Sequence, residues 1–222
     1  MDKIGICGAG LIGASWAIGF ANAGFKCFVY DKSEDSSTKF KSLANKLIQD
    51  LRIINPEIDE EKINSNIKLN CTIEDTCNDS ILVQESVLED LELKKSVFEQ
   101  LDKLSPENTI IASSSSYLLI SRISELVKHK HRCINAHPAL PPHIVPFVEV
   151  SGGVNTDPKI IKQAVSIYKK AKYAAITVNK EAEGFVLNRL QGALLNEAVR
   201  LHEGGFALSL IHISEPTRRS TI

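Results

Sequence analysis

His137 and Glu149 have the side-chain types and spacing needed to move a proton. His137 follows residues 132–136, which predict a strand, and Glu149 interrupts an apolar run at 147–150. Glu149 needs a partner, because an unpaired charge is costly to bury, and the intervening segment can bring it against His137. A lone histidine at a strand end is structural more often than catalytic. The nearby acid favours the catalytic role, since an imidazole oriented by a carboxylate is a general base suited to alcohol oxidation.

Three glycines follow directly after the first short apolar run of the chain. Gly8 permits a tight turn, Gly10 lets the backbone approach a pyrophosphate, and Gly13 lets a helix pack closely on a strand. The amide groups of this turn and the positive end of the following helix face the phosphates. The spacing therefore predicts a dinucleotide site contacted by Gly8, Gly10, Leu11, Ile12 and Gly13.

Asp31 ends a second apolar run, 18 residues after Gly13. A carboxylate there accepts hydrogen bonds from ribose hydroxyls and repels the 2′-phosphate of NADP, so the expected cofactor is NAD. Strand, glycines, helix, second strand and acid occur in order, which is far more specific than the glycines alone. The uncharged stretch 4–25 is long enough to mimic a membrane span. Its many glycines make a poor lipid-facing helix, and the residues before it are not the basic start of a signal peptide.

Four serines, 113–116, follow one expected strand, and Glu89 follows the strand before it. Ligands of open parallel sheets bind beyond the carboxyl ends of the strands, so these residues lie where the nicotinamide end of NAD is expected. Any one serine could instead cap the next helix. We expect Ser116, the last of the run, to bind a substrate oxygen. Asn188, one turn into a long apolar helix, is a polar residue that could reach the same cleft.

Alternating strand and helix patterns position these residues. The expected strands are 3–7, 26–30, 67–69, 80–84, 109–112, 132–136, 147–150 and 174–178. The expected helices are 14–23, 90–104 (with Leu93, Val97, Leu101 and Leu104 facing the sheet), 157–172 and one that begins at 183. The fold class is therefore α/β, with a Rossmann-type, doubly wound, mostly parallel sheet.

Two segments interrupt the alternation. Residues 32–66 predict a helical hairpin after the second strand, and the residues alone favour a solvated cover over one sheet edge. Four prolines fall within 138–146 and are expected to hold that segment extended.

Composition excludes several classes of protein. The chain has 222 residues, is 43% hydrophobic and carries a formal net charge of −1, which gives no electrostatic case for nucleic acid or an anionic membrane. Its 5 cysteines are odd in number and form no C-x-x-C, so we expect reduced thiols in a cytoplasmic protein with no disulfide framework and no metal. His129 and His131 lie in a basic run and are expected to be solvated.

Several of these segments together resemble the 3-hydroxyacyl-CoA dehydrogenase family, most closely its branch with L-gulonate 3-dehydrogenase and lambda-crystallin. The resemblance runs from Lys3 to about Ala207 and is carried by residues 8–13, 84–95 (QESVLEDLELKK), 113–119 (SSSSYLL), 136–150 (AHPALPPHIVPFVEV) and 184–190 (GFVLNRL). It implies a general base at His137 oriented by Glu149, and substrate-oxygen contacts from Ser116 and Asn188.

The resemblance also implies the cofactor contacts and the reaction. Asp31 would bind the adenosine ribose of NAD, and Glu89 and Lys94 would line its nicotinamide end. The implied activity is oxidation of the 3-hydroxyl of a small 3-hydroxy acid, such as L-gulonate or carnitine, to the 3-oxo product. The alternatives are a 3-hydroxyacyl-CoA substrate of fatty-acid oxidation and a non-catalytic, crystallin-like NAD-binding protein. Leu140 stands where the family usually has Asn, which leaves the substrate and full activity open.

The family continues with a helical domain that closes the cleft and supplies a dimer interface. We therefore expect an NAD-binding domain at 1–180, the first helix of a truncated helical domain at 181–208, and a homodimer for the full-length protein. The truncated chain itself is expected to be inactive, and to bind NAD weakly or aggregate. Residues 209–222 resemble translated sequencing-adaptor DNA and are expected to be a non-native tail.

Overall fold

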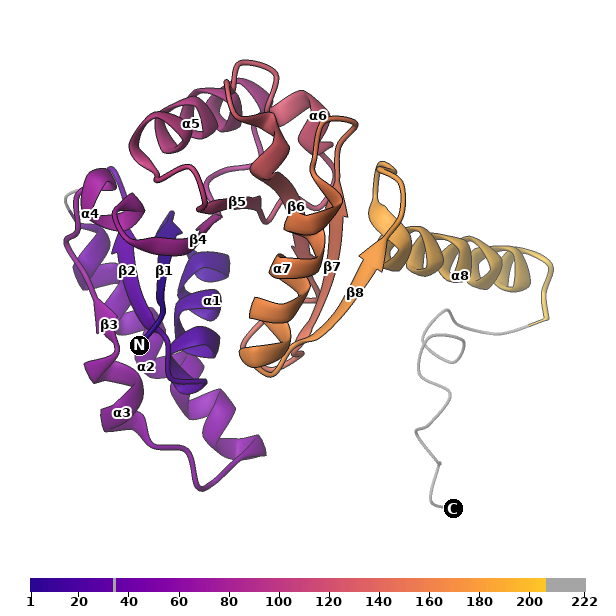
Figure 1. Cartoon of the computed structure of the whole chain (residues 1–222). Coiled ribbons are helices and arrows are strands. Elements are labelled where there is room, and N and C mark those ends of the chain that lie inside the picture. The colour runs from indigo at the N-terminus through magenta and orange to yellow at the C-terminus, as the bar shows by residue number, and fades with distance from the viewer. Residues whose placement is uncertain (34, 207–222) are drawn as a thin grey trace.

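The computed structural model describes residues 1–33 and 35–206, and Figure 1 shows the arrangement of its elements. The strands are β1 (Lys3–Cys7), β2 (Lys26–Tyr30), β3 (Ile67–Lys68), β4 (Ser80–Glu85), β5 (Ile110–Ser113), β6 (Cys133–Pro138), β7 (Phe147–Gly152) and β8 (Ala174–Val178). The helices are α1 (Leu11–Asn22), α2 (Ser36–Ile54), α3 (Glu60–Ser65), α4 (Ile73–Cys77), α5 (Leu91–Leu104), α6 (Ile120–Ile123), the 3-10 helix η1 (Lys130–Arg132), α7 (Pro158–Lys170) and α8 (Phe185–Glu203). The expected tail at 209–222 and the last two residues of the 181–208 segment lie outside the described residues.

The strands of the described residues form one sheet in the order β3-β2-β1-β4-β5-β6-β7-β8. Strand β7 runs antiparallel to β6, and the other neighbouring pairs are parallel. The order reverses between β1 and β4, which places a ligand crevice beyond their carboxyl ends. The expected doubly wound, mostly parallel sheet is confirmed, and α2 and α3 form the helical hairpin between β2 and β3.

Helices cover both faces of the sheet. One apolar cluster packs α1, α2, α3 and α7 on one face, and a second packs α4, α5 and α6 on the other. On the first face Trp16 of α1 lies against Tyr173, with ring centroids 4.8 Å apart, and against Phe20 at 5.5 Å. These aromatic contacts fix α1, and with it the glycine turn at its N-terminus, against the end of α7.

The segment between β6 and β7 corrects one prediction. Residues 141–145 form a turn and not an extended stretch, and the Ile144 and Val145 N–H groups donate to the Pro141 carbonyl at 3.0 and 2.9 Å. Proline is compatible with the first residues of such a turn, because an N–H at that position would make no hydrogen bond within the turn. The turn lets β7 return antiparallel to β6, with Glu149 directly opposite His137.

Helix α5 buries a different face from the expected one. Its buried residues are Lys94, Phe98, Leu101 and Asp102. Of the four predicted positions Leu101 is buried, Val97 and Leu104 are partly buried against the core, and Leu93 lines a groove. Two charged side chains thus replace apolar ones on the inner face, because each meets an opposite charge from another element. Helix α4 was not predicted, although its capping box, Thr72 with Asp75, is a readable start signal.

Asp102 meets the buried Arg132, with Oδ1 2.6 Å from Nη2. Burial acts to raise the pKa of Asp102, but the hydrogen bond and charge of Arg132 outweigh it and lower the pKa below 3.8. His131 is exposed as expected. The expectation of a solvated His129 is wrong, because this residue is half-buried with Nδ1 3.1 Å from Asp102 Oδ1.

His143, in the turn between β6 and β7, gives a stability prediction. It is buried, its Nδ1 lies 3.2 Å from Ser15 Oγ, and burial lowers its pKa below 6.5, although Asp50 acts in the opposite direction. The folded state therefore resists protonation of His143, whereas the unfolded chain binds a proton below about pH 6.5. We expect His143→Gln to reduce the loss of stability between about pH 7 and pH 5.5, measured by urea unfolding. Equal losses in the two proteins would contradict the prediction.

Candidate active site

The turn between β1 and α1 brings the predicted glycines together with Asp31. Gly8 has φ +105°, in the left-handed region that favours glycine. Asp31 Oδ2 accepts a hydrogen bond from the Ala9 N–H at 2.8 Å, and Oδ1 accepts one from the Ser33 N–H at 2.9 Å. A carboxylate has about four acceptor sites, so Asp31 can hold this turn and still bind a ribose hydroxyl.

Two grooves adjoin beyond the carboxyl ends of β1 and β4. The first, of about 350 Å³, is lined by residues that include Gly8, Asp31, Leu88 and Gln100. The second, of about 330 Å³, is lined by Gly10, Leu11, Ile12, Ser86, Val87, Leu88, Glu89, Lys94, Ser114 and Ser116. Gly10 and Ser86 to Leu88 line both grooves. The grooves thus follow the sheet edge from the acid after β2 to the serines after β5, as an extended ligand requires.

The glycines differ in what a side chain would meet, which gives a prediction. A Cβ at position 13 would lie 1.9 Å from Gly8 O, whereas a Cβ at position 10 would meet nothing within 4 Å. We expect Gly13→Ala to lower the free energy of unfolding by about 1–3 kcal/mol and also to weaken NAD binding. Gly10→Ala is the matched control: it should keep the wild-type stability and weaken NAD binding, because its methyl group enters the groove. Urea unfolding and NAD titration test both, and equal stabilities would contradict the packing argument.

His137 and Glu149 lie in contact. His137 Nδ1 is 2.8 Å from Glu149 Oε2, and both side chains are buried. The other carboxylate oxygen, Oε1, accepts hydrogen bonds from the Val186 and Leu187 N–H groups at 3.0 Å each, in the first turn of α8. The Phe185 ring stacks on the His137 ring with centroids 4.7 Å apart. Glu149 is therefore held from both sides, and it fixes the orientation of the imidazole.

The Nε2 atom of His137 has no hydrogen-bond partner in the part of the chain that the structure describes. Some polar atoms of these residues are both fully buried and without a partner, but His137 Nε2 is not one of them. With Nδ1 committed to Glu149, Nε2 is the nitrogen open to a substrate.

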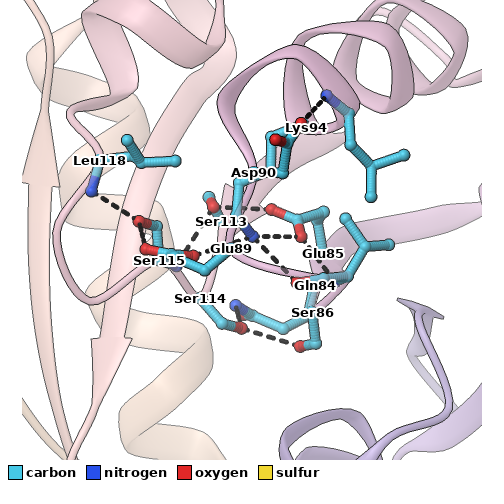
Figure 2. Close-up of polar contacts among 12 residues, drawn as sticks. Gln84, Glu85, Ser86, Glu89, Asp90, Lys94, Ser113, Ser114, Ser115 and Leu118 are labelled. Carbon is cyan, nitrogen blue, oxygen red and sulfur yellow. Dashed lines mark hydrogen bonds and ion pairs between the residues drawn. The ribbon is translucent and has the colours of Figure 1, made fainter.

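The serine run is divided among different tasks, as Figure 2 shows. Ser113 Oγ donates to Glu85 Oε2 at 2.7 Å, and Ser115 Oγ donates to Glu89 and accepts from the Leu118 N–H at 2.7 Å. Ser114 Oγ joins a separate group of polar side chains. Ser116 Oγ alone of the four has no hydrogen-bond partner among the described residues, and Ser116 lines the second groove.

Asn188 lies at the same place. Its Nδ2 donates to the Ser116 carbonyl at 3.3 Å, which joins α8 to the segment after β5. The structure thus brings the predicted Ser116, Asn188 and Glu89 together, because the Ser116 N–H donates to Glu89 Oε1 at 3.2 Å.

Lys94 and Glu85 form a buried ion pair below the second groove. Lys94 Nζ lies 2.7 Å from Glu85 Oε1, 3.2 Å from Val87 O and 3.4 Å from Glu89 Oε2. These three acceptors match the three N–H donors of an ammonium group, so Lys94 holds the turn after β4 and orients Glu89. Burial raises the pKa of Glu85 above 4.5, while Lys94 and its hydrogen bonds oppose the increase.

Glu85 and Phe185 are site residues that the sequence interpretation missed. Glu85 lies at the end of an apolar run, and the argument about an unpaired buried charge that was made for Glu149 applies to it as well. Phe185 follows Gly184 at the start of α8, and no local sequence pattern predicts its contact with His137.

Among residues 1–33 and 35–206, no helix is both long and apolar enough to cross a membrane, and no group of three or more His, Cys, Asp or Glu side chains is placed to hold a metal ion.

A Rossmann-type sheet with a glycine turn, a terminal acid and grooves along its carboxyl edge defines a dinucleotide-binding domain. Residues 3–182 match the family described as 3-hydroxyacyl-CoA dehydrogenase, NAD binding domain, and the chain belongs to that family. It is 38% identical over 203 residues to the lambda-crystallin homolog of Rattus norvegicus, a match that covers 90% of this chain and 64% of the relative. The L-carnitine dehydrogenase of Streptomyces griseus is 32% identical over 205 residues, covering 92% and 61%.

The chain spans somewhat less than two thirds of the length of these curated relatives. Among solved structures, (S)-3-hydroxybutyryl-CoA dehydrogenase from Ralstonia eutropha is similar with a TM-score of 0.84 and 27% identity, covering 93% of this chain and 73% of that one. The family resemblance predicted from the sequence is confirmed.

Proposed function

We propose that the protein containing this chain is an NAD-dependent dehydrogenase that oxidises the 3-hydroxyl of a small 3-hydroxy acid to the 3-oxo product. The observation that carries the proposal is the buried His137–Glu149 pair, with Nδ1 and Oε2 2.8 Å apart and Nε2 open. It lies on the sheet that also carries the glycine turn and both grooves.

The residues divide the reaction between them. His137 Nε2 takes the proton of the substrate hydroxyl, and Glu149 keeps the ring oriented and balances the charge that the imidazole gains. The Ser116 hydroxyl and the Asn188 amide bind the reacting oxygen. The glycine turn, with Leu11 and Ile12, would hold the NAD pyrophosphate, Asp31 its adenosine ribose, and Glu89 its nicotinamide end. Bound there, NAD supplies the acceptor for the hydride from C3.

The substrate class rests on sequence likeness. The curated relatives include an L-carnitine dehydrogenase. The resemblance of the sequence to the branch with L-gulonate 3-dehydrogenase adds L-gulonate as a second small acid. The similar enzyme from Ralstonia eutropha is named for 3-hydroxybutyryl-CoA, and a 3-hydroxyacyl-CoA is the alternative substrate class. Leu140, with 60% of its surface exposed in the turn after His137, offers an alkyl group and no amide to the substrate.

The proposed assembly rests on the exposed leucines of α8, and the proposed location rests on the cysteines. Leu190, Leu194 and Leu195 of α8 are exposed in the described residues, and Figure 1 shows α8 extending away from the sheet. A helical domain in the remainder of the protein, together with a second subunit, would cover them. Five buried, unpaired cysteines favour a reducing compartment such as the cytoplasm.

The test is NADH formation by the protein that contains this chain, with L-gulonate, L-carnitine and 3-hydroxybutyryl-CoA as separate substrates. Turnover of a small acid supports the proposal, and turnover of the CoA ester alone moves it to the alternative class. A protein that binds NAD but turns over none of the three would support a non-catalytic role like that of a crystallin.

A further inference from the structure

A group of polar side chains between α1, α7 and the crevice has no part in the function described above. Ser114 Oγ lies 3.1 Å from Trp16 Nε1, 2.8 Å from Gln84 Nε2 and 2.8 Å from Ser86 Oγ. The Tyr168 hydroxyl donates to Gln84 Oε1 on the other side of the amide. Figure 2 shows Ser86 and Ser114 facing each other, apart from the Lys94–Glu85 pair.

The donors in this group fix the direction of each hydrogen bond. An indole N–H can only donate, so Ser114 Oγ accepts from Trp16. The Gln84 amide turns its oxygen to Tyr168 and its nitrogen to Ser114. The reverse orientation would leave the hydrogen of the buried Tyr168 hydroxyl without an acceptor among the described residues, which is costly.

Ser114 Oγ therefore accepts two hydrogen bonds. A hydroxyl has two lone pairs and one hydrogen, so Ser114 must donate that hydrogen to its third neighbour, Ser86 Oγ. Ser86 accepts at this contact, and its own hydrogen has no acceptor in the part of the chain that the structure covers. The network thus turns Ser86 into a hydrogen-bond donor directed away from Ser114.

Ser86 lies where the two grooves adjoin. It lines both of them, together with Gly10, and the second groove continues to Glu89 and Ser116. Its backbone packs on the glycine turn, since a Cβ at Gly8 would lie 2.7 Å from Ser86 O. A dinucleotide that runs from Asp31 to Glu89 must pass this point with its ribose–phosphate backbone, which presents oxygen acceptors.

We propose that Ser86 donates a hydrogen bond to a ribose or phosphate oxygen on the nicotinamide side of the bound dinucleotide, and that Trp16, Gln84 and Tyr168 set the direction of this hydrogen bond through Ser114. The inference rests on the proposed binding of NAD. It adds Ser86 as a cofactor contact and the other four as positioning residues.

The experiment compares the binding of NAD and AMP to the purified protein and to Ser86→Ala by calorimetric titration. AMP is the probe for the adenosine end at Asp31, because it lacks the phosphate and ribose of the nicotinamide side. We expect Ser86→Ala to weaken NAD binding about 3- to 30-fold and to leave AMP binding unchanged, because one hydrogen bond to a polar or charged acceptor is lost. Unchanged NAD affinity, or equal losses for NAD and AMP, would overturn the inference. A wild-type protein that binds no NAD would instead refute the proposed function.

Tyr168→Phe tests the direction of the hydrogen bond between Ser114 and Ser86 with a change at a residue that lines neither groove. Without the tyrosine hydroxyl, the Gln84 amide is free to turn its oxygen to Ser114, which then donates to Gln84 and accepts from Ser86. We expect a loss of NAD affinity in the same direction as in Ser86→Ala, with AMP binding unchanged. Wild-type NAD affinity in Tyr168→Phe would overturn the assignment of the positioning residues.

Discussion

Replacing His137 by alanine is expected to lower kcat by about 10²- to 10⁴-fold, the contribution that general base catalysis usually makes. NAD binding should be unchanged, because the glycine turn lies between β1 and α1 and Asp31 directly follows β2, apart from β6. The loss should fall on kcat, since the imidazole acts on the proton as the hydride leaves. Steady-state kinetics with the best substrate, together with NAD titration, separate the two effects.

His143→Gln is the matched control for His137→Ala. His143 is also buried and lies in the turn that follows β6, but its Nδ1 contacts Ser15 and no carboxylate. Its replacement should leave kcat near the wild-type value. If His137→Ala kept wild-type turnover, or if the two variants lost activity equally, His137 would not be the base, and the proposed mechanism would fail.

The glycine turn and Asp31 were predictable because they lie close together in the sequence. Gly8, Gly13 and Asp31 are fixed by the length of one strand–helix–strand unit, and the structure places them as that unit requires. The contact of Glu149 with His137 was predictable for another reason. A charge in an apolar strand needs a partner, and an imidazole ended the preceding strand.

The ion pair of Lys94 with Glu85 was harder to predict. Lys94 lies in a helix rich in charge, where its neighbour Lys95 is bound to exposed acids, and helical periodicity alone puts both on the solvent side. Its burial depends on Glu85, which lies at the end of β4 and pairs with it. Local patterns describe one element at a time, so a polar contact between two elements becomes visible only after they pack.

Replacing Lys94 by methionine is expected to lower the free energy of unfolding by about 3–5 kcal/mol, the usual cost of removing one partner from a buried ion pair. Methionine fills much of the lysine volume, so the loss comes from the charge left on Glu85 and not from a cavity. Lys103→Met is the control on the same helix. Its pair with Glu99 is largely exposed, with 68% and 40% of the side chains accessible, and should cost at most about 1 kcal/mol.

The loss in Lys94→Met should depend on pH in a direction that identifies its cause. Burial already raises the pKa of Glu85 above 4.5, and removing Lys94 takes away the charge that opposes this increase. An acid with a raised folded-state pKa binds its proton more tightly when folded, so its contribution to stability improves as pH falls through that value. The deficit of Lys94→Met relative to wild type should therefore be smaller at about pH 5.5 than at about pH 8.

A double variant, Lys94→Met with Glu85→Gln, separates charge from packing. The Val87 N–H donates to Oε1 of Glu85 and the Ser113 hydroxyl donates to Oε2, at 2.7 Å each. Glutamine keeps an oxygen for the Val87 N–H, its NH2 group can donate to the rotatable Ser113 hydroxyl, and it has no charge to leave unpaired. We expect it to recover most of the lost stability and to remove the pH dependence of the deficit. A deficit that stays constant with pH and persists in the double variant would show that Lys94 stabilises the fold by packing its alkyl chain. The ion pair would then not be what holds the turn that carries Glu89.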